Sequence, residues 1–142
     1  MKKIRDSILS FAHIGVFTLF VLVPCFLSAK EVTLTQEVNG KAISLAIGDF
    51  LYINLVGNMT TGFSWTVASQ EGTSLKYVEH GYSPFPSILP MHVGSPGLFS
   101  FKFLAVSPGP SVLKLVYARS WEKGVPPVHV FKVFVDVGNK NR

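Results

Sequence analysis

The stretch Leu98-Phe99-Ser100-Phe101-Lys102-Phe103-Leu104-Ala105-Val106 carries a phenylalanine or alanine at every second position from 99 to 105. Alternate side chains of a strand point to opposite faces of a sheet. We therefore expect the three phenylalanines and Ala105 on a buried face, and Ser100 and Lys102 on a wet one. A strand with one buried and one wet face is typical of antiparallel sheets.

The same alternation recurs along the chain, and turn signals such as Asn39-Gly40, Gly48-Asp49 and Pro108-Gly109 separate the runs. The other predicted strands are residues 31–36, 42–46, 49–55, 63–69, 74–80, 112–118 and 128–137. No sustained helical period appears after the first 29 residues. The sequence predicts an all-β fold, an immunoglobulin-like antiparallel β-sandwich of seven or eight strands.

The N-terminus has the composition of a secretory leader. Lys2, Lys3 and Arg5 precede an apolar run over residues 14–27, and two small residues follow at 28–29. This order is typical of a signal peptide. We expect a signal peptide at residues 1–29, cleavage after Ala29, and one β-sandwich domain at residues 30–142.

The predicted mature protein is secreted or periplasmic, and we expect a monomer. The competing interpretation is an uncleaved membrane anchor, because residues 8–29 are long enough to cross a bilayer. The single cysteine, Cys25, lies in the leader, where proline precedes it and makes a poor lipid-attachment site. Without it the mature domain has no disulfide and depends on its core.

Composition argues against several function classes. The net charge is +5, but lysines are spread singly and no basic run alternates with exposed aromatics, so we expect no nucleic-acid partner. His80, His92 and His129 have no metal-ligand spacing. No nucleophile, phosphate-loop or paired-carboxylate motif appears. We expect no enzyme activity, no metal and no cofactor.

Three loops between the predicted strands favour binding. The first is Gly57-Asn58-Met59-Thr60-Thr61-Gly62-Phe63-Ser64-Trp65, in which glycines can take positive φ and Asn58 and the threonines can bond the backbone. The result would be a preformed tip with small hydroxyls. The alternative is a structural turn in which Phe63 and Trp65 enter the core.

The second loop, residues 81–97, holds four prolines between Tyr82 and Gly97 and includes apolar Met91 and Val93. A connection of this length is usually functional or disordered, and the alternative is a crossover between sheets. The third loop, residues 119–127, carries Arg119 and Trp121, two residue types enriched at interface hot spots. The alternative there is that Trp121 folds back over the sandwich while Arg119 pairs with Glu122.

These loops resemble the chagasin family of reversible protein inhibitors of papain-like cysteine peptidases. The family has Asn-Pro-Thr-Thr-Gly-Phe in the first loop, and this chain has Asn58-Met59-Thr60-Thr61-Gly62-Phe63. Gly94-Ser95-Pro96-Gly97 stands where the family has Gly-x-Gly-Gly. Arg119-Ser120-Trp121-Glu122 stands where the family has Arg-Pro-Trp followed by an aromatic residue.

The resemblance implies a noncovalent inhibitor that fills the peptidase cleft with three loops. Thr60 and Thr61 would lie over the catalytic cysteine, Trp121 and Arg119 would grip one wall, and residues 94–97 would pair with the enzyme backbone. The protease-binding residues expected on this basis are Asn58, Met59, Thr60, Thr61, Gly62, Phe63, Met91, Val93, Gly94, Ser95, Pro96, Gly97, Arg119, Ser120 and Trp121.

The departures from the family pattern predict altered affinity or target range. Met59 and Ser120 replace prolines, Pro96 removes a backbone donor, and Glu122 places charge where an aromatic is usual. Asn58-Met59-Thr60 is also a glycosylation sequon, and a glycan there would block the loop. The alternative function is an immunoglobulin-like adhesion or assembly module; a small hydrolase is a more distant one.

Overall fold

The computed structural model describes residues 28–86 and 94–139. Residues 1–27 of the expected leader therefore lie outside the described residues. Met91, His92 and Val93 of the second loop also lie outside them. The elements are β1 (Glu31–Leu34), η1 (Gln36–Val38), β2 (Ala42–Ala46), β3 (Phe50–Gly57), η2 (Met59–Thr61), β4 (Ser64–Glu71), β5 (Leu75–Pro84), β6 (Gly97–Ala105), β7 (Gly109–Ala118) and β8 (His129–Gly138).

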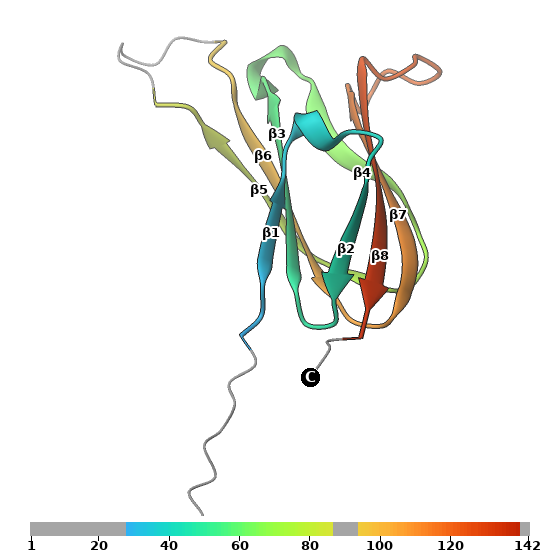
Figure 1. The fold of residues 1–142 in the computed structure, drawn as a ribbon. Coiled ribbons are helices and arrows are strands. Elements are labelled where there is room, and N and C mark those ends of the chain that lie inside the picture. Colours follow the sequence, from blue (N-terminus) through green and yellow to red (C-terminus); the bar gives the residue numbers. More distant parts are fainter. Residues whose placement is uncertain (1–27, 87–93, 140–142) are drawn as a thin grey trace, which may run out of the picture.

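The eight strands form two facing sheets, ordered β1-β3-β6-β5 and β2-β8-β7-β4, as Figure 1 shows. The predicted all-β sandwich is confirmed. Each sheet also has a parallel edge pair, β1 with β3 and β2 with β8, so the sheets are mixed rather than wholly antiparallel. The physical reason is that η1 and the Asn39-Gly40 turn carry the chain from one sheet to the other, which prevents β1 and β2 from forming a hairpin.

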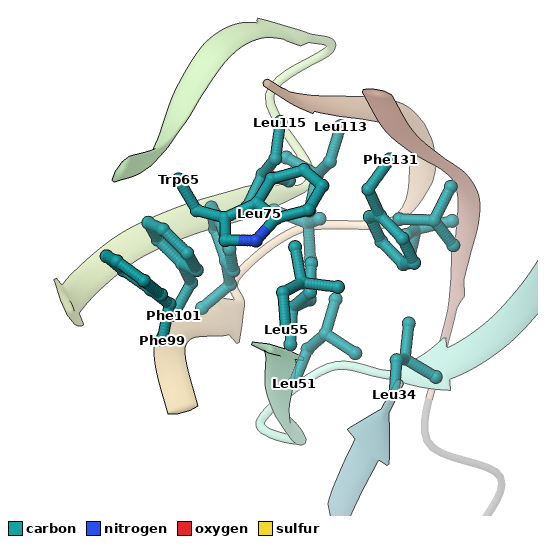
Figure 2. Packing of buried hydrophobic residues seen from close by; sticks show 14 of the residues in the cluster. Leu34, Leu51, Leu55, Trp65, Leu75, Phe99, Phe101, Leu113, Leu115 and Phe131 are labelled. Carbon is teal, nitrogen blue, oxygen red and sulfur yellow. The ribbon is translucent and has the colours of Figure 1, made fainter. Parts of the chain in front are cut away.

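The core lies between the sheets and is built from the alternating residues (Figure 2). Phe103 on β6 and Phe131 on β8 have no exposed surface, and Trp65 on β4 is also buried, with its indole N–H donating to the Val56 carbonyl at 3.0 Å. Fully burying such a side chain contributes roughly 1.5–3 kcal/mol. The predicted inward faces of residues 99–105, 113–117 and 131–137 are all confirmed.

Strand pairing brings the connections of interest to one end of the sandwich. Gly57 at the end of β3 pairs with Gly97 at the start of β6, which also pairs with Pro84 at the end of β5. In the other sheet, the end of β7 meets the starts of β4 and β8. We call this end the loop pole; it is uppermost in Figure 1.

The first and last described strands begin and end at the opposite pole. Glu31 pairs with Phe50 at the start of β3, and Gly138 pairs with Ala46 at the end of β2. Figure 1 shows both ends of the described chain leaving the sandwich there. Within the described residues, no helix has the length and apolar character needed to cross a membrane.

Candidate functional site

The first loop is fixed by hydrogen bonds of its own side chains. Asn58 Oδ1 accepts from the Thr60 N–H at 3.0 Å and from Thr60 Oγ1 at 2.6 Å, and Thr61 Oγ1 donates to the Asn58 carbonyl at 2.7 Å. Asn58 thus caps the short helix η2, as asparagine does at helix starts. Met59, Thr60 and Thr61 remain exposed. The predicted self-bonded polar tip is confirmed.

The two glycines of this loop have different roles. Gly62 ends η2 at φ +80°, and its N–H donates to the Met59 carbonyl at 3.1 Å. The sequence predicts that Gly57 can take positive φ as well, but this glycine is the last residue of β3 and its φ is not positive. A side chain there would come within 2.8 Å of Phe99 and 2.9 Å of Tyr117. Gly57 is therefore needed for close packing rather than for a turn.

Tyr117 supports the first loop from beneath, a role the sequence reasoning missed. Its hydroxyl accepts from the Asn58 N–H at 2.7 Å and donates to the Asn58 carbonyl at 3.2 Å. Its ring stacks on Phe63 at a centroid distance of 5.3 Å. The alternation of the strand predicts only that the Tyr117 ring lies in the core, where the structure places it. The available signal was its hydroxyl, because a buried tyrosine usually needs a hydrogen-bond partner.

The second loop is tied to the first. Asn58 Nδ2 donates to the Gly94 carbonyl at 2.6 Å, and Gly94 is exposed at φ +111°. Pro96 is also exposed, and its carbonyl accepts from the Phe85 N–H at 3.1 Å. Gly97 is buried in β6, where a side chain would collide with Ser83 and Tyr82, so it belongs to the sandwich rather than to the loop tip.

The third loop lies against the other side of the first. Arg119 Nε donates to the Thr61 carbonyl at 3.2 Å, and Arg119 Nη1 lies 3.0 Å from Glu122 Oε1. Ser120 is exposed, and Trp121 leaves 65% of its surface exposed while its ring borders Gly62. The alternative interpretation of this loop holds in part: Arg119 does pair with Glu122, but Trp121 remains largely open to solvent.

The structure thus brings together, at the loop pole, the predicted site residues that it describes. Asn58 bonds to the second loop, and Thr61 and Gly62 contact the third. His129 at the same pole is exposed and stacks on Tyr117 at 5.9 Å, as expected of a face residue. No set of three or more metal-ligating side chains occurs in the described part of the chain.

The protein is thus a β-sandwich that presents three loops at one pole, and the first loop is bonded to each of the other two. Residues 44–135 match the family described as "Chagasin family peptidase inhibitor I42". The chain therefore belongs to the chagasin family. Its members are peptidase inhibitors, which confirms that the chain is not an enzyme.

Individual relatives agree with this assignment. Amoebiasin-1 of Entamoeba histolytica is 35% identical over 91 residues, which are 63% of this chain and 83% of that protein. Chagasin of Trypanosoma cruzi is 31% identical over 91 residues, or 61% of this chain and 80% of that protein.

Solved structures share the fold. The crystal structure of a cysteine protease inhibitor from Entamoeba histolytica has a TM-score of 0.69 at 23% identity and covers 78% of this chain and 97% of that chain. The solution structure of Amebosin has a TM-score of 0.61 at 32% identity and covers 78% and 100%. These similarities support the sandwich architecture of the chain.

Proposed function

We propose that this protein is a reversible, noncovalent inhibitor of papain-like cysteine peptidases that occludes their active-site cleft with its three loops. The observation that carries the proposal is the bonding of the loops to one another at one pole, through Asn58 to Gly94 and through Arg119 to Thr61. Loops already held in one arrangement lose little conformational entropy on binding. A typical contact of this kind would bury about 1,600 Å² in total.

The tip of the first loop suits a narrow cleft. Thr60 and Thr61 are exposed but held by Asn58, so they present small side chains on a fixed backbone. We assign them to the space over the catalytic cysteine. A peptide bond held rigidly from both ends cannot reach the geometry of nucleophilic attack. The inhibitor then blocks the enzyme and is not cleaved.

The flanking loops supply the outer contacts. Trp121 offers a large exposed aromatic ring beside the tip, and aromatic rings of this kind are frequent hot spots. Gly94, Ser95 and Pro96 lie on the other side, next to Asn58. Met59 is 46% exposed where the family has proline, and we assign to it the adaptable apolar contact that favours a different target range.

Titration of papain with the purified protein tests this function, with Trp121→Ala as the diagnostic variant. We expect stoichiometric, reversible inhibition by the wild type. The variant should weaken binding by about 2 kcal/mol or more, roughly thirtyfold in the inhibition constant. Phe134→Ala is the matched control, because Phe134 is 41% exposed on β8 and lies away from the loops. An unchanged constant for Trp121→Ala would refute its role.

Thr61→Trp separates an inhibitor from an adhesion module. A bulky ring at the tip should clash inside a narrow cleft and abolish inhibition of papain. Thr61 is exposed, but the variant loses the hydrogen bond from Thr61 Oγ1 to the Asn58 carbonyl, so Thr61→Val, which loses the same bond without the bulk, is the matched control. A module that binds a flat protein surface or a glycan with its loops need not respond. Retained inhibition by this variant would contradict insertion of the tip.

We further propose that residues 1–29 are removed on export and that the monomeric domain acts outside the cytoplasm. The composition of the leader supports this, and the lack of cysteine beyond Cys25 means that the domain needs no oxidation after export. Intact-mass measurement of the exported protein tests the cleavage site. A mass that includes the leader would support the anchored alternative.

A further inference from the structure

The guanidinium of Arg119 is committed to contacts within the protein. Its Nε donates to the Thr61 carbonyl at 3.2 Å, its Nη1 lies 3.0 Å from Glu122 Oε1, and its Cζ lies 4.3 Å from the centre of the Phe63 ring. We call Arg119, Glu122, Thr61 and Phe63 the Arg119 cluster. The planar guanidinium of Arg119 thus contacts a carboxylate, a backbone carbonyl and an aromatic ring at the same time.

The Arg119 cluster holds the third loop against the first. Thr61 and Phe63 belong to the first loop, whereas Arg119 and Glu122 flank Trp121 in the third. The Glu122 N–H also donates to the Arg119 carbonyl at 3.2 Å, which closes a turn around Trp121. Fixing the residues on either side of Trp121 fixes the backbone from which its exposed ring projects.

We propose that Arg119 is a positioning residue anchored by Glu122, and that Trp121 rather than Arg119 makes the peptidase contact of this loop. This inference rests on the proposed inhibitory function and refines it. The ion pair and the turn closed by the Glu122 N–H preorganise the loop in this chain, in which Ser120 rather than a rigid proline stands between Arg119 and Trp121.

We expect the Arg119 cluster to have a moderate effect on the inhibition constant. The side chains of Arg119 and Glu122 are 35% and 32% exposed, so solvent weakens their attraction relative to a buried pair. The contacts of Arg119 with the Phe63 ring and the Thr61 carbonyl add to the stabilisation from the ion pair. Losing the anchor should raise the inhibition constant by roughly 3- to 10-fold through a faster dissociation rate, because the loop must then be ordered on binding.

Glu122→Ala distinguishes positioning from direct contact by the sign of its effect. If Arg119 positions the loop, removing its anchor weakens inhibition of papain. If Arg119 grips the peptidase itself, removing Glu122 frees the guanidinium, and inhibition is unchanged or tighter. Unchanged or tighter inhibition by Glu122→Ala overturns the proposal.

Arg119→Lys supplies a second test with the charge retained. Lysine lacks the planar fork and cannot bond the Thr61 carbonyl and the Glu122 carboxylate in the same geometry. We expect it to weaken inhibition about as much as Glu122→Ala. Wild-type affinity in this variant would overturn the proposal, because a positive charge alone would then suffice.

Two controls complete the experiment. Glu71→Ala removes the same charge from an exposed position at the end of β4, at the opposite pole, and should leave inhibition unchanged. Amide hydrogen exchange over residues 119–128 of the free protein should be faster in Glu122→Ala than in the wild type. Equal exchange rates in Glu122→Ala and the wild type would overturn the positioning role of Arg119. This readout does not depend on papain. Failure of the wild-type protein to inhibit papain would refute the proposed function separately.

Discussion

Gly62 meets two independent demands at a single position. Its φ of +80° is in the left-handed region, and a side chain there would come within 2.9 Å of Trp121 Cζ2. The first demand is a property of the backbone, whereas the second depends on where Trp121 lies. Glycine satisfies both, because it has no Cβ.

Gly62→Ala should therefore weaken inhibition more than stability alone explains. The backbone strain costs about 1 kcal/mol, and the new methyl group must also displace the Trp121 ring. Gly48→Ala is the matched control, because Gly48 has φ +90° and no atom within 4 Å of the added carbon. Urea denaturation and papain inhibition measure the two effects. Similar inhibition by both variants would contradict the contact between Gly62 and Trp121.

Strand β7 supports the loop pole as well as the core. Its buried residues end at Tyr117, whose hydroxyl bonds both backbone groups of Asn58 in the first loop. The end of the strand therefore holds the first loop at Asn58. Arg119, two residues after Tyr117, holds the same loop at the Thr61 carbonyl.

Tyr117→Phe should lower the free energy of unfolding by about 1–2 kcal/mol, because the Asn58 N–H loses its partner in a part-buried position. The ring and its stacking on Phe63 are retained, so any loss of inhibition reflects loop position. Tyr82→Phe is the control, since Tyr82 also packs on Phe99 but lies in the other sheet. Equal unfolding midpoints for the two variants would argue against support by the Tyr117 hydroxyl.

The strands could be predicted from sequence because burial imposes a period of two. Residues 99–105 show this directly, since each inward position is a phenylalanine or alanine. The parallel pairing of β1 with β3 and of β2 with β8 could not be predicted in this way. The alternation along β1 and β2 shows which face of each strand is buried, but it does not show which strand each of them is hydrogen-bonded to.

The first loop could be recognised, but its supports could not. Asn58 and the threonines bond within three positions of one another, which is a local signal. By contrast, the Arg119–Thr61 bond joins residues 58 positions apart, and the Asn58–Gly94 bond joins residues 36 apart. Contacts of this kind depend on how the strands are ordered, so no local pattern encodes them.

The whole molecule depends on one core without covalent reinforcement. Residues 30–142 contain no cysteine, so no disulfide restrains the unfolded chain. Phe103 lies on one sheet and Phe131 on the other, and neither side chain has exposed surface. Stability is therefore concentrated in the aromatic and aliphatic layer shown in Figure 2.

Phe103→Ala should lower the free energy of unfolding by about 3–5 kcal/mol, a large share of the total for a domain of this size. Phe134→Ala, at an exposed aromatic on β8, should cost less than about 1 kcal/mol. Urea titration followed by circular dichroism measures both, with and without a reducing agent. Comparable midpoints for the two variants would contradict the assigned core.

Because the described chain enters and leaves the sandwich at the pole remote from the loops, a group attached next to β1 or β8 would lie at the opposite pole from the proposed binding surface. A membrane tether before β1, an affinity label after β8, or a bead coupled to one of them would hold the protein by its base. The gripping end would then face outward into solution, free to meet an enzyme.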